Sequence, residues 1–379
     1  MASRVYLHVG LPKTGTTYLQ SVLWANKDAL DAQGILLPGR HARDQMWATL
    51  VVREHPGLPN RKAPARTSWG RIVEQVRAHE GPAVISHEFF GAATEEQAAR
   101  AIADLDAEVH LVVTARDVLT VVASYWQEFV KHGFFERGLD DFPADGTSWE
   151  EWTWRTLDLE QVLRRWTVVV PPERVHLLVL PDASEPRETL WLQFAGILGI
   201  ADADTFALDA ARENNSLGVV EAEFMRRVSA GLDDFSTALD RGVWLRGFLA
   251  HGQLVGRGGD RPRPSEARVE ELRARADATV AWLEGTGFDV QGDLQRLRVP
   301  ANVPGRDPAS VTEGELLEVA TATVRGVLAT MRTTRQENTR LKAEIDDLAA
   351  RVVAADEPAP ESQRGGLRRR LRRSAEPGS

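Results

Sequence analysis

Gly10-Leu11-Pro12-Lys13-Thr14-Gly15-Thr16-Thr17 is the stretch that decides the fold of this chain. Its two glycines have the spacing of a phosphate-binding loop, G-x-x-x-x-G-K-[ST], and Thr16 and Thr17 supply the hydroxyl groups that follow the second glycine. The residue directly after Gly15 is threonine, however, and the lysine of the stretch lies inside the loop, at Lys13. The stretch therefore predicts a loop that surrounds an anion, with its lysine in an unusual position.

The flanking residues predict a strand before the loop and a helix after it. Apolar and polar residues alternate over residues 5–9, as in a short strand. Leu19, Val22 and Leu23 recur at helical spacing, and we expect Thr16 or Thr17 to cap the first turn. An anion in this loop would meet backbone N–H groups, hydroxyls, the positive end of a helix dipole and one ammonium group. The alternative is an ordinary glycine-rich turn with a solvated lysine.

The segment Pro12-Lys13-Thr14-Gly15-Thr16-Thr17 resembles the 5′-phosphosulfate loop of the sulfotransferases that use 3′-phosphoadenosine 5′-phosphosulfate (PAPS), and the bacterial branch in particular. The resemblance implies PAPS as donor, 3′-phosphoadenosine 5′-phosphate (PAP) as product, and no required metal. It also implies an α/β fold like that of P-loop NTPases, with a parallel sheet wrapped by helices. The residues that it assigns to donor binding here are Pro12, Lys13, Thr14, Gly15, Thr16 and Thr17, and Lys13 would also take part in catalysis.

A second pair of residues matches the 3′-phosphate motif of the same family. Residues 108–115 form an apolar run that predicts a buried strand ending at Arg116, and Asp117 is expected to cap the following helix. The family has an arginine at such a strand end and a serine eight residues later, which Arg116 and Ser124 match. A guanidinium offers a phosphate a fork of donors, and a hydroxyl adds one more. The alternatives are an ion pair between Arg116 and Asp117 and a small residue where helices cross.

A general base is expected at the end of a third strand, predicted over residues 83–88. Because successive strand side chains point to opposite faces, only one of His87 and Glu88 should face the donor. The family takes its base, histidine or glutamate, from this part of the chain, and we favour Glu88. Phe89 and Phe90 beside it should desolvate its carboxylate and raise its pKa. His87 is the competitor, since imidazole titrates near neutrality, and both residues could also simply end the strand.

Strands and helices alternate along the first two hundred residues, which predicts a parallel sheet covered by helices. Ligands in such sheets bind at the carboxyl ends of the strands, where Lys13, Glu88 and Arg116 would converge. Besides the elements above, we expect strands at 34–37 and 175–180 and helices at about 69–79, 94–105, 118–130 and 188–198.

Two other classes of protein remain open. A kinase-like phosphotransferase would hold Mg²⁺ with a loop hydroxyl and an aspartate at a neighbouring strand end. The candidate strand ends, 86–88 and 114–117, do not give an apolar strand that ends directly in such an aspartate. The second alternative is a non-catalytic scaffold that has kept the nucleotide fold.

Composition restricts the setting. The 379 residues contain no cysteine, 43% hydrophobic residues and a formal net charge of −9. These features predict one catalytic domain with an appendage, no disulfide or thiolate metal site, a cytoplasmic location and no nucleic-acid partner.

The acceptor is less clearly indicated. We expect a hydroxyl, or less favourably an amine, on a carbohydrate, a lipid or a small molecule. Five of the eleven tryptophans lie between residues 126 and 166. Trp149, Trp152 and Trp154 lie among carboxylates and could stack on a sugar or lipid head group. Tryptophans 149, 152 and 166 could equally form the apolar face of a helix, and this second reading is favoured.

Beyond residue 205 the resemblance weakens. Cytosolic members of the family carry an R-K-G-x-x-G-D-W-K-like segment, and residues 256–261 match it only faintly and suit a flexible loop. Residues 212–218 instead resemble an N-x-S segment of bacterial relatives, so that Arg212 and Ser216 are further candidates for nucleotide binding.

The C-terminal region differs from the rest in kind. A Pro/Gly/Asp linker follows the catalytic domain (1–300), and Ser310 with Glu313 suggests a capping box for a helix over 309–353. Its heptads favour a parallel two-stranded coiled coil, and therefore a homodimer, although the helix could instead pack on its own domain. The arginine-rich tail, 354–379, is expected to be disordered and could contact anionic lipid. The a positions are Val324, Met331, Asn338, Ile345 and Val352, and the d positions are Val327, Thr334, Leu341 and Leu348.

Overall fold

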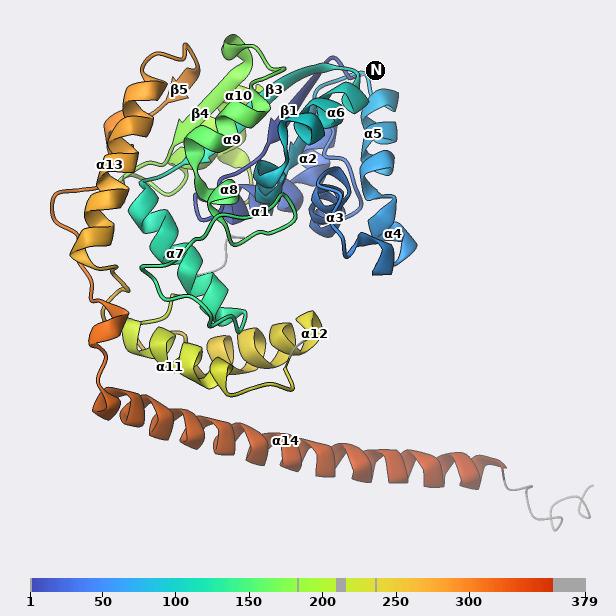
Figure 1. Cartoon of the computed structure of the whole chain (residues 1–379). Coiled ribbons are helices and arrows are strands. Elements are labelled where there is room, and N and C mark those ends of the chain that lie inside the picture. The colour runs from blue at the N-terminus through green and yellow to red at the C-terminus, as the bar shows by residue number, and fades with distance from the viewer. Residues whose placement is uncertain (1, 183, 209–215, 236, 357–379) are drawn as a thin grey trace, which may run out of the picture. The chain divides into compact units, whose positions relative to one another are not determined.

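The computed structural model describes residues 2–182, 184–208, 216–235 and 237–356 (Figure 1). The chain divides into two units, Met1–Val319 and Ala320–Ser379. The first unit holds the sheet and almost all of the helices. The described part of the second unit is the continuation of a single long helix.

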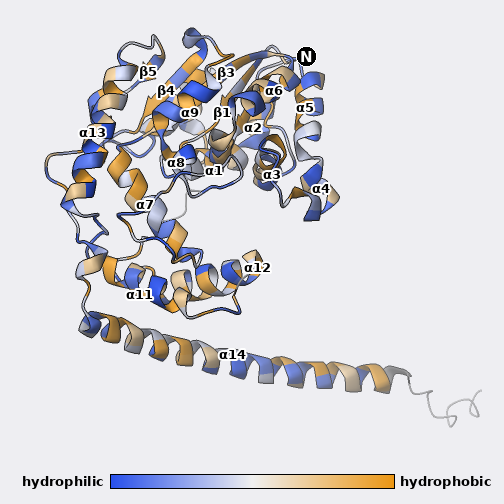
Figure 2. Cartoon of the chain, viewed as in Figure 1, coloured by the Kyte–Doolittle hydropathy of each residue, from blue (hydrophilic) through white to orange (hydrophobic). Residues whose placement is uncertain are grey.

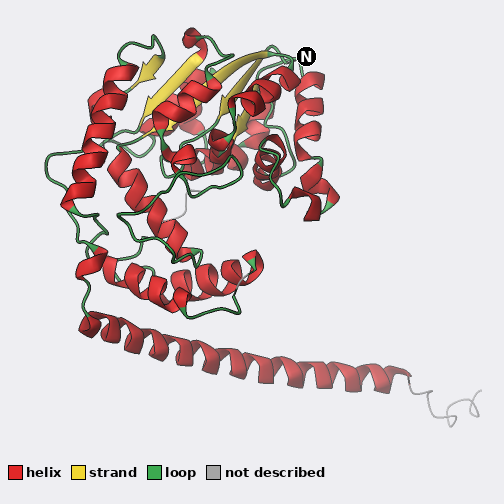
Figure 3. Cartoon of the chain, viewed as in Figure 1, coloured by secondary structure: helices red, strands yellow, loops and turns green. Residues whose placement is uncertain are grey.

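The first unit is built on a parallel sheet, as the sequence predicts. Among the described residues it has five strands in the order β2-β1-β3-β4-β5, and every neighbouring pair is parallel (Figure 3). The sequence order reverses direction between β1 and β3, which makes the crevice beyond their carboxyl ends the expected ligand site. The strands are β1 (Arg4–His8), β2 (Ala83–Ser86), β3 (Glu108–Ala115), β4 (Val175–Val179) and β5 (Asp289–Gln291).

Helices cover both faces of this sheet. The α-helices are α1 (Thr16–Ala25), α2 (Lys27–Ala32), α3 (Ala42–Val52), α4 (Ala63–Arg66), α5 (Ser68–Ala78), α6 (Glu95–Leu105), α7 (Val118–Lys131), α8 (Trp154–Leu157), α9 (Leu159–Trp166), α10 (Thr189–Leu198), α11 (Val219–Ala230), α12 (Ala238–Asp240), α13 (Glu266–Leu283) and α14 (Glu313–Asp356). Short 3₁₀ helices are η1 (Leu58–Asn60), η2 (Glu88–Ala92), η3 (Pro172–Arg174), η4 (Ala203–Thr205), η6 (Leu294–Leu297) and η7 (Pro308–Ser310), and η5 (Arg241–Leu254) is a π-helix.

The alternation of side chains along the strands divides the core into layers. Val5 and Leu7 point to the face covered by α3, α5, α6 and α9. Tyr6 points to the opposite face, which α1, α2 and α10 cover. A separate cluster joins α7, α8, α11 and α13 beyond the sheet. Strand β4 is accordingly among the most apolar segments in Figure 2, whereas the short edge strand β5 contains the polar residues Asp289 and Gln291.

Several local predictions are wrong. Thr16 and Thr17 do not cap α1, because Gly15 occupies the N-cap position and no side chain accepts a hydrogen bond there. Residues 34–37 form no strand, but only a single bridge from Leu36 to Ala83. Strand β2 ends at Ser86, so that Glu88 opens η2 instead of ending the strand.

The predicted capping box before α14 lies two residues later than expected. The Glu315 carboxylate accepts from the Thr312 backbone N–H at 2.9 Å, and the Thr312 hydroxyl accepts from the Glu315 N–H at 3.4 Å. By contrast, Asp117 caps α7 as predicted, with its carboxylate accepting from the Thr120 N–H at 2.8 Å.

The long helix α14 spans 44 residues, and its first turns belong to the first unit. Leu316 packs there with Val219 and Val311. From Ala320 onward the helix is described by itself, and apolar and polar residues alternate along it (Figure 2). A search of the described helices for a bilayer-spanning apolar segment finds none.

Candidate functional site

The glycine-rich loop begins alongside β3. The Leu11 N–H donates to the Thr114 carbonyl at 2.9 Å, and the Thr114 N–H donates to the Gly10 carbonyl at 2.7 Å. The loop then turns through positive φ at Lys13 (64°) and Gly15 (84°) before α1 begins. The loop is therefore fixed at the carboxyl ends of β1 and β3, where the strand order reverses.

Gly10 brings this loop against the segment that carries Glu88. The φ angle of Gly10 is +135°, a backbone conformation that residues with a side chain rarely adopt. A Cβ atom at this position would lie 3.2 Å from the Glu88 carbonyl oxygen. The His87 N–H also donates to the His8 carbonyl at 3.0 Å. The end of β2 is thus held directly beside the start of the loop.

The turn leaves a run of backbone donors without acceptors. Among the residues that the structure describes, no N–H group from Lys13 to Tyr18 donates a hydrogen bond, and the next N–H, that of Leu19, bonds to the Gly15 carbonyl. Six successive unpaired donors at the start of a helix are a suitable environment for a phosphate or sulfate group.

The predicted loop residues contribute in different ways. The Thr14 hydroxyl is buried, donates to the Leu11 carbonyl and lies 2.6 Å from the Thr114 hydroxyl, so that it fixes the loop from within. Pro12 and Thr16 are also buried, whereas Thr17 is exposed. Neither the Thr16 nor the Thr17 hydroxyl has a hydrogen-bond partner among the described residues. An anion would therefore use backbone N–H groups together with Thr16, Thr17 and Lys13, rather than the Thr14 hydroxyl.

The buried side chain of His8, at the end of β1, contacts the two strands on either side of β1. The His8 Nδ1 lies 2.8 Å from the Ser86 hydroxyl, and its Nε2 lies 3.3 Å from the Thr114 hydroxyl. Complete burial lowers the pKa of His8 from 6.5 to about 4, so the ring is neutral at physiological pH. His8 is therefore a structural link between β1, β2 and β3.

Lys13 belongs to a charge cluster that the sequence does not predict, and that consists of Lys13, Glu128, Lys131 and Arg246. The Glu128 carboxylate lies 3.4 Å from the Lys13 Nζ, 2.9 Å from the Lys131 Nζ and 3.7 Å from the Arg246 guanidinium. Burial alone would raise the pKa of Glu128, but the three cations outweigh it and lower the pKa to about 2. Three cations surround one carboxylate, and the excess positive charge favours an anionic ligand beside the loop.

Glu88 is positioned by a residue of α1. The Gln20 side-chain amide donates to the Glu88 carboxylate at 3.0 Å, and Gln20 lies one helical turn after Thr16. The prediction of a raised pKa for Glu88 is wrong. Burial alone would raise its pKa, but the nearby His87 ring and the hydrogen bond from Gln20 lower it overall. Glu88 is therefore an ionised carboxylate that can accept a proton but is a weaker base than predicted.

His87 is less available as a base. Its Nδ1 accepts from the Phe89 backbone N–H at 3.2 Å, which leaves the ring proton on Nε2 in the neutral form. Burial lowers the pKa of His87, so the ring is neutral near pH 7. Its unprotonated nitrogen is already engaged, which makes Glu88 the better candidate.

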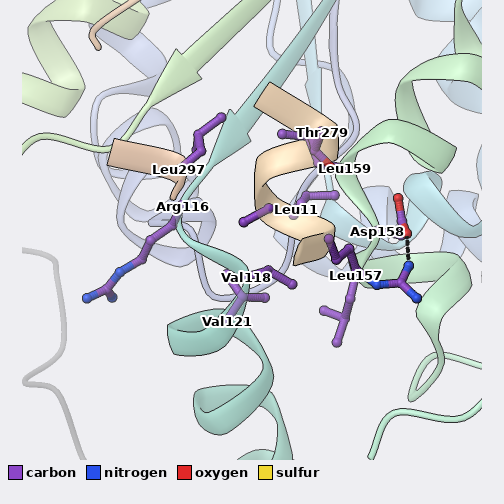
Figure 4. A pocket seen from close by; sticks show the side chains of 11 residues that line it. Leu11, Arg116, Val118, Val121, Leu157, Asp158, Leu159, Thr279 and Leu297 are labelled. Atoms are coloured by element: carbon purple, nitrogen blue, oxygen red, sulfur yellow. Dashed lines mark hydrogen bonds and ion pairs between the residues drawn. The ribbon is translucent and has the colours of Figure 1, made fainter. Parts of the chain in front are cut away.

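Arg116 follows β3 directly, as predicted. Its side chain is 41% exposed and pairs with Asp117 at 3.6 Å. It contributes to the lining of a cavity of about 30 Å³ between the loop residue Leu11, the start of α7 and α13. Figure 4 shows its guanidinium extending away from the apolar side chains of that cavity. The Asp117 pair is weak at this exposure, so a phosphate could replace it.

Ser124 lies on the same side of α7 as Glu128. The two residues are one helical turn apart, and Glu128 contacts Lys13, so Ser124 faces the region of the loop. Its side chain is half-buried and has no hydrogen-bond partner among the described residues.

Of the two candidates beyond residue 205, the structure describes only Ser216, and Arg212 lies outside the described residues. Ser216 is exposed and precedes Leu217, whose N–H donates to the Gln127 side chain of α7 at 2.9 Å. Ser216 is therefore close in sequence to an anchor on the helix that carries Ser124.

The tryptophans do not form one helix face. Trp149 is exposed, and both Trp149 and Trp152 precede α8, so the helix interpretation is wrong for them. Trp152 packs against Tyr125 and Phe129 of α7, with ring centroids 4.6 and 5.9 Å apart. Trp166 is fully buried at the end of α9.

A search of the described residues for three or more grouped His, Cys, Asp or Glu side chains that could hold a metal ion finds none. Comparisons with protein-family models, with curated proteins and with solved structures also find no match for this chain.

Sequence reasoning missed Gln20, Glu128, Lys131 and Arg246. Two of these positions carry a usable signal, because Gln20 is four residues after Thr16 and Glu128 is four residues after Ser124. Arg246 lies on the distant π-helix η5, and no local pattern places it beside Glu128.

Proposed function

We propose that this protein is a PAPS-dependent sulfotransferase whose donor binds at the carboxyl ends of β1 and β3. The observation that carries the proposal is the run of unpaired N–H groups from Lys13 to Tyr18, with the Lys13 ammonium beside it. A phosphosulfate offers several anionic oxygens to such donors. Arg116 and Ser124, at the end of β3 and on α7, would hold the 3′-phosphate.

The reaction would be an in-line displacement at sulfur. The acceptor hydroxyl oxygen forms a bond to sulfur while the bond between sulfur and the phosphate oxygen breaks, and PAP leaves. Lys13 and the loop N–H groups stabilise the charge that develops on that phosphate oxygen. The Glu88 carboxylate, oriented by Gln20, accepts the hydroxyl proton.

The acceptor is proposed only by class, as a hydroxyl, or less favourably an amine, on a carbohydrate, lipid or small molecule. Donor binding separates the three possible classes of protein. Calorimetric titration with PAP and ADP should show much tighter binding of PAP, and labelled PAPS offered with a panel of acceptors should give turnover. Equal binding of PAP and ADP would favour a kinase-like phosphotransferase, whereas binding of neither would favour a scaffold.

The base is tested by two matched amide variants. Glu88→Gln keeps the shape of the side chain and its contact with Gln20 but removes the proton acceptor, so kcat should fall by about 100-fold or more. His87→Gln should reduce kcat much less, because the His87 Nδ1 is engaged by the Phe89 N–H. The reverse order would assign the base to His87.

A further inference from the structure

The second unit presents an apolar seam with an arrangement of charges beside it. The a and d residues Val324, Met331, Leu341, Ile345, Leu348 and Val352 are between 41% and 63% exposed. The helix has no break between Glu313 and Asp356. The seam is apolar except at Thr334 and Asn338, and such an exposed apolar surface is costly in water unless another helix covers it.

The charges that flank the seam indicate which helix covers it. In the heptad register, the two g positions that flank Asn338 and Ile345 are Glu337 and Glu344, the next g position is Arg351, and the e positions nearest to Asn338 are Arg335 and Lys342. Between residues 335 and 344, acids therefore lie on one side of the seam and bases on the other. This segregation makes the flank of one copy complementary to the opposite flank of another.

We propose that α14 pairs with α14 of a second copy in a parallel, in-register coiled coil. In this arrangement a g residue meets the e residue five positions later on the other chain, so Glu337 meets Lys342 of the second copy. The symmetric contact forms twice. An antiparallel pair centred on residues 335–344 would instead place g beside g and e beside e, so Glu337 would face Glu344 of the second copy and Arg335 would face Lys342.

The contacts within the helix leave this pairing free to form. Glu337 accepts from Arg340 at 2.6 and 2.9 Å, but a carboxylate can accept further hydrogen bonds. Lys342 makes no ion pair or hydrogen bond among the described residues. Asn338 at an a position would meet Asn338 of the second copy, which favours two strands in one register.

Charge reversal tests the pairing in the full-length protein. Sedimentation equilibrium should give twice the 41.9 kDa chain mass for the wild type. Glu337→Lys places two like-charged pairs in the seam and should raise the dimer Kd by roughly tenfold. Adding Lys342→Glu to the same chain should restore the wild-type Kd. Asp346→Lys, which makes the same charge change at a b position away from the seam, should leave the Kd within about twofold.

Orientation is tested by single cysteines, since the chain contains none of its own. Thr334→Cys and Val352→Cys should each form a disulfide-linked dimer under mild oxidation, because both residues face themselves in a parallel register. Thr339→Cys, at an outward b position, should not. An antiparallel pair allows at most one of the two seam positions to face itself. A monomeric wild type, an unrestored double charge variant, or cross-linking at only one seam position would overturn the proposal.

Discussion

Glu128→Gln should lower the free energy of unfolding of the protein and, at the same time, tighten its binding of PAP. The variant removes the negative charge that Lys13, Lys131 and Arg246 share, while it keeps the size of the side chain. The lowering of the Glu128 pKa from 4.5 to about 2 corresponds to about 3 kcal/mol of net stabilisation of the ionised carboxylate, after the cost of its burial has been offset by these cations. Since the carboxylate is only 16% exposed, most of this energy should be lost from the free energy of unfolding.

The effect on binding should have the opposite sign. Lys13 must leave Glu128 to contact a phosphosulfate, and giving up a partly exposed pair costs about 1 kcal/mol. In the variant this cost disappears, so the Kd for PAP should fall about fivefold. Denaturant unfolding measures the change in stability, and calorimetric titration with PAP measures the change in Kd. The matched control is Glu160→Gln, which removes an exposed ion pair with Arg164. If PAP binds more weakly to Glu128→Gln, then Glu128 orients Lys13 for the donor and does not compete with it.

Three other variants test the remaining parts of the structure. Lys13→Ala should lower kcat by about 100-fold, because it removes the ammonium that we propose stabilises the leaving phosphate, and near-normal turnover would refute this role. Arg116→Ala should weaken the binding of PAP by roughly 1.5 to 3 kcal/mol and leave the binding of ADP, which has a free 3′-hydroxyl, almost unchanged. If titrations show that the variant prefers PAP over ADP as strongly as the wild type does, the 3′-phosphate site lies elsewhere. His8 lowers stability in mild acid, because its pKa is about 4 when folded and 6.5 when unfolded, so the unfolded chain takes up a proton first. Between pH 7.5 and 5 the wild type should lose about 2 kcal/mol more unfolding free energy than His8→Gln, and parallel pH curves for the two proteins would exclude this origin.

The sheet could be predicted from sequence because its information is local. Residues 5–9, 108–115 and 175–180 are rich in apolar residues, and each overlaps a strand of the observed parallel sheet, β1, β3 and β4 respectively. Residues 34–37 have a similar composition, but the chain there pairs through Leu36 alone. Composition does not determine how many backbone groups reach a neighbouring strand.

The electrostatics of the candidate site could not be predicted, because they depend on contacts across the fold. The two phenylalanines after Glu88 suggest desolvation and a raised pKa, and Glu88 is indeed largely buried. Its pKa is nevertheless lowered, because the fold also brings Gln20 and His87 to the carboxylate. Glu128 likewise gains two of its three cations, Lys13 and Arg246, from distant parts of the chain, whereas Lys131 lies three residues away on α7. Local sequence predicts which helix, strand or loop carries a charged residue, but not which other charged groups lie around its side chain.

The bridge at Leu36 limits how the sheet can grow. The Leu36 N–H donates to the Pro82 carbonyl and its carbonyl accepts from the Val84 N–H, both at 2.9 Å, along the outer edge of β2. At the other edge, β5 has only three residues. Neither border therefore offers a long row of free backbone groups to an incoming strand, which is how sheet proteins avoid joining edge to edge into aggregates. Two copies of the protein would therefore associate through side-chain surfaces and not by pairing of strand edges. The affinity of such an association can be changed by single substitutions.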